Sequence, residues 1–215
     1  MRINKIYSSP LITFLIFVIM WCPSWSYAKD ITVLAFGDSL IAGYGLPETD
    51  QFCAQLEIFL KEEGELVSVV NAGVSGDTSM AGFSRLEWSL ASNPDAVILE
   101  LGANDGLRGL DPAVTRMNLK KILQQLKRIG TPVLFAGMLA PPNLGKEYGK
   151  EFNAVFSELA SEYDVIFYPF FLDGVAGRPR LNQSDGIHPN REGVREIIKR
   201  IIPYVRKLLT QVKQN

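Results

Sequence analysis

The sequence is poor in histidine and cysteine, and it carries almost no net charge. One histidine and two cysteines occur among its 215 residues, too few for a metal site built from imidazole or thiolate ligands, and we expect no metal. The 22 lysines and arginines nearly balance the 23 aspartates and glutamates, so the formal net charge is −1. That balance provides no excess of positive charge for a phosphate backbone, and we expect no nucleic-acid partner.

Long apolar runs are scarce as well, and one of them lies near the N-terminus. A basic start at 2–5, a mainly apolar stretch at 11–20 and the small residues Ser26 and Ala28 form the pattern of a secretory signal peptide. The apolar stretch is too short to span a bilayer comfortably, which takes about 20 residues. We therefore expect residues 1–28 to be a cleaved signal peptide, with an uncleaved N-terminal anchor as the alternative.

The remaining chain, 29–215, has the length of one domain and retains Cys53 as its one cysteine, so no intramolecular disulfide is expected. Near-continuous apolar runs predict buried strands, and the stretches between them carry helical patterns. The predicted strands are 31–36, 66–71, 96–101, 132–137 and 165–168, and the predicted helices are 50–63, 78–92, 112–129, 147–162 and 190–209, with Pro203 expected to kink or split the last one. Such alternation predicts a single α/β domain, a three-layer α/β/α sandwich around a parallel sheet.

Three short motifs follow the first three predicted strands. Ser39 stands in Gly37-Asp38-Ser39-Leu40, Gly73 follows the second strand, and Asn104 follows the third. All three belong at the carboxyl edge of the sheet, where open α/β folds bind ligands. A flavodoxin-like strand order of 2-1-3-4-5 would place Ser39 between the Gly73 backbone and the Asn104 amide, which are hydrogen-bond donors suited to an oxyanion.

The single histidine lies far downstream, three residues after an aspartate, in Asp185-Gly186-Ile187-His188-Pro189. A serine hydroxyl becomes a good nucleophile when a neutral imidazole takes its proton and a carboxylate fixes the imidazole tautomer. Ser39, His188 and Asp185 have the residue types for these three roles. Because this chemistry needs a neutral imidazole, activity should fall on acidification.

These four blocks, in this order over nearly the whole of 29–215, resemble the SGNH (GDSL) hydrolases. Longer stretches at 75–79, 104–108 and 185–190 resemble the exported thioesterase, lysophospholipase and arylesterase branch of Gram-negative bacteria. The resemblance implies Ser39 as nucleophile, His188 as base and Asp185 as orienting acid. It also implies Gly73 and Asn104 as oxyanion donors beside the Ser39 N–H.

The resemblance further implies a periplasmic serine hydrolase that cleaves acyl esters and thioesters through an acyl-enzyme. No cofactor is expected, and the partners would be small acyl substrates, with at most transient membrane contact through lipid substrates. A carbohydrate acetyl esterase with a polar pocket and an inactive acyl-binding protein remain as alternatives. The residues do not reveal the acyl chain length, the preference for ester or thioester, or the oligomeric state, for which a monomer is the simpler expectation.

A few residues near these motifs allow more than one interpretation. Ser75 is a rival nucleophile, but its Gly-x-Ser-x-Gly pattern is incomplete, so a turn or cap is favoured. Asp77 and Asp105 are each expected to stabilise their own loop through local backbone hydrogen bonds, Asp105 with the better chance of touching the site. The apolar loop 138–144 is either an acyl-binding wall or a packed connector. Glu100, inside an apolar strand, has no functional explanation from the sequence.

Overall fold

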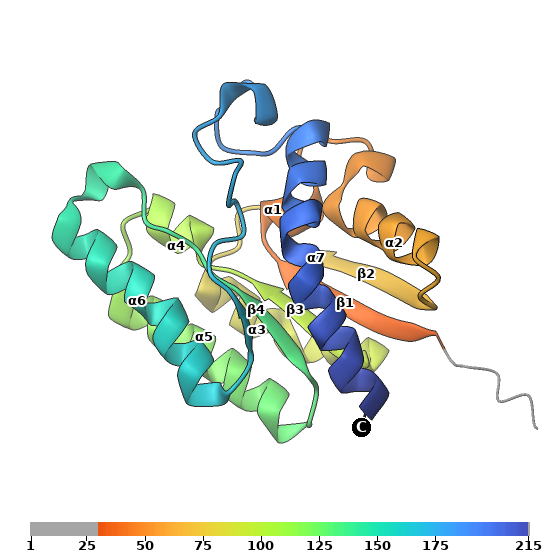
Figure 1. Ribbon diagram of the computed structural model, residues 1–215. Helices are drawn as coiled ribbons and strands as arrows, with labels where there is room; N and C mark the ends of the chain where they lie inside the picture. The colour runs from red at the N-terminus through yellow and green to blue at the C-terminus, as the bar shows by residue number, and fades with distance from the viewer. Residues whose placement is uncertain (1–29, 215) are drawn as a thin grey trace, which may run out of the picture.

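A computed structural model describes residues 30–214 and shows one parallel sheet of five strands, in the order β2-β1-β3-β4-β5 (Figure 1). The expected signal peptide lies outside the described residues. The predicted strand order is confirmed, because strand one pairs with both strand two and strand three. The strands are β1 (Ile31–Gly37), β2 (Val67–Gly73), β3 (Ala96–Glu100), β4 (Val133–Ala136) and β5 (Ile166–Tyr168).

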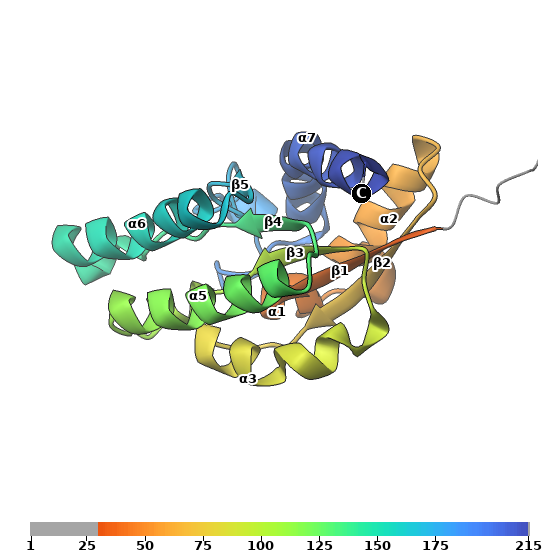
Figure 2. The ribbon, with the colours of Figure 1, turned by 90° about the horizontal axis from the view of Figure 1, so that it is seen from below.

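Helices cover both faces of this sheet, which gives the predicted three layers (Figure 2). The longer helices are α2 (Phe52–Glu62), α3 (Ser79–Ser89), α5 (Pro112–Arg128), α6 (Lys146–Tyr163) and α7 (Arg191–Gln214), and the short ones are α1 (Ser39–Ala42) and α4 (Ala103–Leu107). Helices α2 and α7 lie together on one face, while α3 and α5 lie on the other, where α6 packs beside α5. Both short helices were absent from the sequence prediction, and both carry residues of the site.

The last helix continues through Pro203, so the predicted split is wrong. A proline inside a helix costs about 3 kcal/mol, because it removes a backbone hydrogen bond and crowds the preceding turn. Pro203 itself is exposed, whereas its neighbours Ile201, Ile202 and Val205 are buried. Burying each of these side chains is worth about 1.5–3 kcal/mol, which outweighs the local penalty. Between residues 30 and 214, no helix combines the length and the apolar character that crossing a membrane requires.

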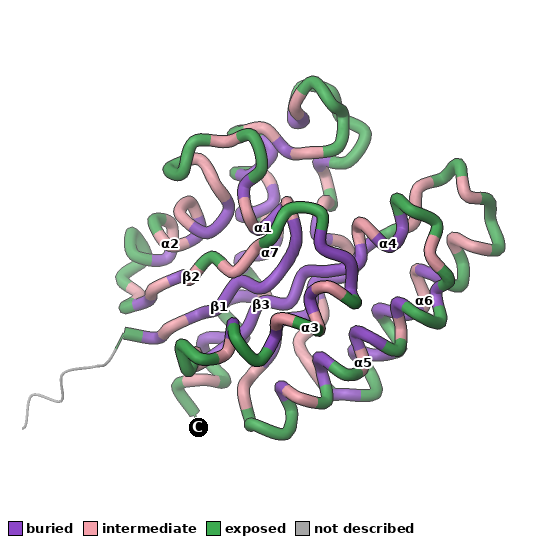
Figure 3. Tube along the Cα trace, turned by 180° about the vertical axis from the view of Figure 1, so that it is seen from behind, coloured by how far each residue is buried: buried purple, intermediate pink, exposed green. Residues whose placement is uncertain are grey.

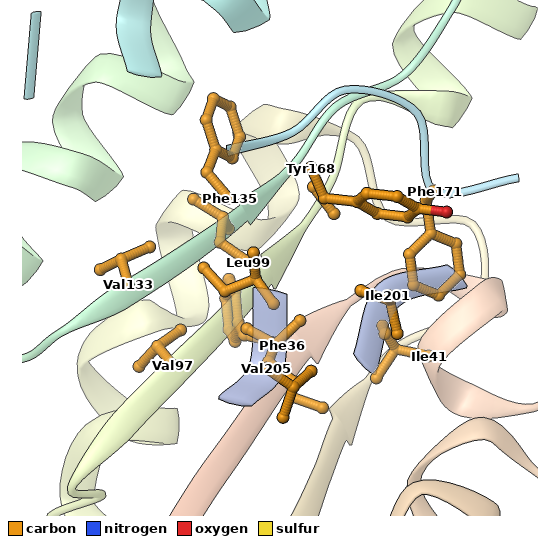
Figure 4. Close-up of a cluster of buried hydrophobic side chains, with 14 of the residues drawn as sticks. Phe36, Ile41, Val97, Leu99, Val133, Phe135, Tyr168, Phe171, Ile201 and Val205 are labelled. Carbon is orange, nitrogen blue, oxygen red and sulfur yellow. The ribbon is translucent and has the colours of Figure 1, made fainter. Parts of the chain in front are cut away.

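The core follows from the near-continuous apolar strands. In the sheet register, Phe36 pairs with Leu99, and Leu99 pairs with Phe135, so these side chains form a row across three strands. The Phe135 ring packs against Phe156 of α6 with centroids 5.7 Å apart. Figure 4 shows this row among the buried cluster to which α7 also contributes, and Figure 3 shows β1 and β3 buried along most of their length. The strand ends at the carboxyl edge are therefore held by a rigid core.

Candidate active site

Ser39 is the first residue of α1, directly after the turn that leaves β1. Asp38 caps this helix, since its Oδ1 accepts the Leu40 N–H at 3.0 Å. The turn has room only for glycine at position 37, where a Cβ would lie 2.5 Å from the Glu100 carbonyl oxygen. Close packing of β1 against β3 and the helix cap together fix the position of the Ser39 side chain.

The second part of the site is the loop that precedes α7. His188 Nε2 lies 2.9 Å from Ser39 Oγ, and His188 Nδ1 lies 2.6 Å from Asp185 Oδ2. The other oxygen, Asp185 Oδ1, accepts the backbone N–H groups of Ile187 and His188 at 2.9 and 3.0 Å. Gly186 allows the tight turn between them, because its φ of +72° is unfavourable for other residues. One carboxylate therefore shapes the loop and orients the ring.

The same contacts determine the charge of this carboxylate. The hydrogen bond from the His188 side chain, together with the His188 and Ile187 N–H groups, lowers the pKa of Asp185 to about 2. Asp185 is therefore ionised at neutral pH, so the imidazole proton belongs on Nδ1, next to the carboxylate. His188 Nε2 is then left as an acceptor for the Ser39 hydroxyl, as nucleophile activation requires.

Two residues that the sequence analysis did not single out hold the histidine loop against the nucleophile. The Tyr44 ring lies over the His188 ring with centroids 4.5 Å apart. The Gln183 side chain donates from Nε2 to the carbonyl oxygens of Tyr44 and Pro189 at 2.7 and 3.0 Å, and its backbone N–H donates to the His188 carbonyl at 2.8 Å. The one signal in the sequence for Gln183 was its position two residues before Asp185.

Gly73 lies at the predicted edge, at the end of β2 and opposite Gly37, but its N–H is occupied. That N–H donates to the Asn71 side chain at 2.9 Å, so it is not free for an oxyanion in this structure. A Cβ at Gly73 would overlap the backbone of Ile41 and Ala42. The glycine therefore lets α1 pack closely on β2.

Asn104 extends from α4 toward the nucleophile turn. Its Nδ2 donates to Asp38 Oδ2 at 3.1 Å and to the Asp77 carbonyl at 3.0 Å, so the amide joins the ends of three strands. The neighbouring Asp105 accepts hydrogen bonds from Ser79 and from Thr115, which ties α4 to α3 and α5. These are tertiary bonds, so the prediction of a local loop role for Asp105 is wrong.

Asp77 also acts at a distance from its own loop, because its carboxylate pairs with Arg85 of α3 at 2.5 Å. The predicted local backbone bond from the Asp77 side chain is replaced by this ion pair. Arg85 in turn donates to the carbonyl oxygens of Gly37 and Ala72, at the ends of β1 and β2. Asp77 therefore orients the arginine that ties both strand ends to α3.

A cavity of about 620 Å³ opens from Ser39, Asn104 and His188. The rest of its lining is mostly apolar, from Leu40, Ala103, Leu107, Phe170, Leu172, Ala176, Ile187 and the segment 138–142. The first five residues of the loop 138–144 thus form the wall that the sequence analysis considered. Ser75 is exposed and does not line this cavity. Over residues 30–214, no three histidine, cysteine or acidic side chains gather as metal ligands.

Comparison with known proteins agrees with this geometry. The GDSL-like Lipase/Acylhydrolase family matches residues 35–196. The chain belongs to this family. It is therefore an acylhydrolase of the SGNH type, and the resemblance seen in the sequence is confirmed.

Several known proteins are similar to this GDSL-like hydrolase over most of its length. Esterase TesA of Pseudomonas aeruginosa is 40% identical over 83% of this chain and 89% of its own. Thioesterase 1/protease 1/lysophospholipase L1 of Escherichia coli K12 is 42% identical over 75% of this chain and 76% of its own. The crystal structure of the SGNH-hydrolase family esterase AlinE4 covers 86% of this chain and 99% of its own, with 46% identity and a TM-score of 0.72.

Proposed function

We propose that this protein hydrolyses esters and thioesters of acyl chains through an acyl-enzyme formed on Ser39. One observation carries the proposal. The hydrogen-bonded series from Ser39 Oγ through His188 to Asp185 opens directly into a mostly apolar cavity. The series supplies an activated nucleophile, and the cavity suits the hydrocarbon part of an acyl group.

The contacts assign a role to each member of the series. Ser39 Oγ attacks the acyl carbon while His188 Nε2 accepts its proton, and the imidazolium that results is stabilised by Asp185. His188 then gives the proton to the departing alkoxide or thiolate, which leaves the acyl group on Ser39. Water attacks this intermediate in the reverse sense, with His188 again as base, and releases the carboxylic acid.

We assign three donors to the acyl oxygen: the Ser39 N–H, the Asn104 amide and a backbone N–H from the loop after β2. For the third, Gly76 fits better than Gly73. Gly76 adopts a φ of +87°, adjoins the Asp77 carbonyl that Asn104 contacts, and its N–H has no acceptor within residues 30–214. Removing one such donor typically costs about 2.7–4 kcal/mol of transition-state stabilisation.

The cavity also narrows the substrate class. A mostly apolar lining favours medium or long acyl chains over the acetyl groups of a carbohydrate, because each buried methylene contributes about 0.8 kcal/mol. The names of the relatives point the same way, with esterase, arylesterase, thioesterase and lysophospholipase among them. The signal-peptide pattern at 1–28 supports action in the periplasm on such substrates.

The test uses chain 29–215 with p-nitrophenyl esters of two to sixteen carbons, acyl-CoA and lysophospholipid. A phosphonate probe should label Ser39, and Ser39→Ala should abolish both labelling and nearly all turnover. Ser75→Ala is the matched control and should retain both. If the Ser39→Ala variant keeps the turnover of the wild type, the proposal is wrong. Folded protein that binds acyl chains without labelling would instead indicate an acyl-binding protein.

A further inference from the structure

Two carboxyl groups, Asp38 and Glu100, lie together beneath the nucleophile with no exposure to solvent. Glu100 ends β3, and Asp38 follows the end of the neighbouring strand β1. The Asp38 N–H donates to Glu100 Oε2 at 3.2 Å. The two side chains are also hydrogen-bonding partners, and two buried carboxylates at that distance would repel each other strongly, so the pair carries one negative charge and one proton.

The hydrogen-bond donors around the pair show which carboxyl holds the charge. Each oxygen of Asp38 accepts an N–H, from Leu40 at Oδ1 and from Asn104 at Oδ2. Glu100 accepts only the Asp38 N–H, and no donor within residues 30–214 reaches its buried Oε1. A buried anion needs donors, whereas a protonated oxygen supplies one. The charge therefore belongs on Asp38 and the proton on Glu100.

The electrostatic surroundings give the same order. Burial raises the pKa of Asp38 to about 6, while burial and the adjacent Asp38 charge raise the pKa of Glu100 well above its ordinary value. When His188 is protonated, its charge also favours the ionised form of Asp38 from the opposite loop. The nearby Arg85 guanidinium donates to the Gly37 carbonyl and pairs with Asp77. Of the two groups, Glu100 is the harder to ionise.

Asp38 connects this buried proton to the reaction. Its Oδ1 caps the helix that begins with Ser39, and its Oδ2 holds one N–H of the Asn104 amide. Because the amide is planar, that bond also fixes the direction of the second N–H of Asn104, which donates to the Asp77 carbonyl and would be shared with the acyl oxygen of a bound substrate. If the Asp38 carboxylate rotated away from Asn104, the hydrogen bond that holds the Asn104 amide would be lost.

We infer that Glu100 is a neutral carboxylic acid at neutral pH and a positioning residue, whose O–H holds the Asp38 carboxylate so that Asp38 in turn aims Asn104 at the acyl oxygen. The catalytic part of this inference rests on the proposed function. The protonation part does not, since it follows from buried groups alone. No bond is made or broken in this role, and the proton stays on Glu100 throughout the reaction.

Infrared spectroscopy tests the protonation independently of activity. Chain 29–215 in D₂O at neutral pH should show the carbonyl band of a protonated carboxylic acid, and Glu100→Gln should lack it. Glu57→Gln is the matched control, because Glu57 accepts hydrogen bonds from Lys61 and Val69 and has a lowered pKa, so this variant should keep the band. If the wild type and Glu100→Gln have the same spectrum in this region, the inference is wrong.

Kinetics test the positioning role. Glu100→Gln keeps a donor and should retain kcat within about threefold, whereas Glu100→Leu should lower kcat about 10- to 100-fold with little change in KM. In an Asn104→Ala background, Glu100→Leu should cause no further loss, because both changes act through one amide. The inference is wrong if the losses of kcat from Asn104→Ala and Glu100→Leu multiply in the double variant. It is also wrong if Glu100→Gln loses as much kcat as Glu100→Leu. Should Glu100→Leu fail to fold, Glu100→Gln and the infrared band still decide it.

Discussion

Gln183 and Tyr44, 139 residues apart in the sequence, are joined by a hydrogen bond of 2.7 Å from the Gln183 side chain to the Tyr44 carbonyl. The same side chain also reaches the Pro189 carbonyl, and the Gln183 backbone N–H reaches the His188 carbonyl. Gly45 leaves space for this crossing, since a Cβ there would overlap the Gln183 amide. The histidine loop is therefore joined to the nucleophile segment by a glutamine whose side chain hydrogen-bonds Tyr44 and Pro189, not Ser39 or His188.

Gln183→Ala should lower kcat about 10-fold with little change in KM, because the histidine loop loses its side-chain bond to the nucleophile segment. Phosphonate labelling of Ser39 should slow by a similar factor. Gln55→Ala is the control, since the Gln55 amide also donates to a backbone carbonyl, that of Thr49, at an exposed position. If Gln183→Ala and the wild type have equal kinetics, the histidine loop does not need this side-chain hydrogen bond.

Alanine should affect stability and kcat differently at Gly73, which ends β2, and at Gly76, in the loop that follows. Gly73→Ala should lower the Tm sharply, because the new methyl overlaps the backbone of Ile41 and Ala42. At Gly76 a methyl meets only the end of Arg108 at 3.9 Å, although the φ of +87° adds strain. Gly76→Ala should therefore lower kcat more than stability. Steady-state kinetics and thermal melts of both variants check this, and the reverse pattern would restore Gly73 as the donor.

Stability should depend on pH through Glu100. Its folded pKa is raised above the unfolded value of 4.5, so its contribution is complete below that pH and is lost as the pH rises toward the folded pKa. Above pH 5 and up to the folded pKa, the free energy of unfolding of the wild type should therefore fall faster than that of Glu100→Gln, at a limiting rate of about 1.4 kcal/mol per pH unit. Urea melts across this range measure the slope.

Glu57→Gln provides the control of opposite sign. Hydrogen bonds from Lys61 and Val69 lower the pKa of Glu57, so it stabilises the fold above pH 4.5 and loses that contribution on acidification. Glu57→Gln should thus be less stable than the wild type by a constant amount from pH 5 to 8. A parallel offset for Glu100→Gln would mean that Glu100 is ionised.

Chain-length preference should respond to the cavity wall. Leu139→Asp places a charge where a longer acyl chain would lie, and hydrolysis of eight- to twelve-carbon esters should fall about 10-fold relative to the acetyl ester. Val114→Asp changes a similarly exposed apolar residue that does not line the cavity, and it should alter neither rate. A uniform loss on all chain lengths would place Leu139 outside the acyl path.

The fold could be predicted from sequence because the strands are buried on both faces. Their apolar runs are nearly continuous, and the motifs that follow the first three strands imply a shared edge. Pro203 shows the limit of local rules, since the helix that contains it is held by buried neighbours on either side. The helix predicted for 78–92 ends three residues earlier, at Ser89, because its last three residues form a 3₁₀ turn, Leu90–Ser92.

The site was predictable where chemistry restricts the choice, as with the one histidine and the aspartate three residues before it. Gly73 was chosen by its position after a strand, but hydrogen bonding decides which N–H is free, and Asn71 occupies that one. The partners of Asp105 and Gln183 come from other elements, so no local pattern reveals them. Glu100 had no explanation until Asp38 was seen beside it.

Helix α7 starts next to His188 and runs the full depth of the sheet, which brings the last described residues back to the start of β1. Asp30, Ile31, Val212 and Lys213 line one hollow there, and Lys213 pairs with Glu65. Both ends of the described domain therefore lie on the side opposite the active-site residues (Figure 1). A solid support, an affinity tag or a short peptide that joins the two ends could be attached on that side of the domain without obstructing substrate entry.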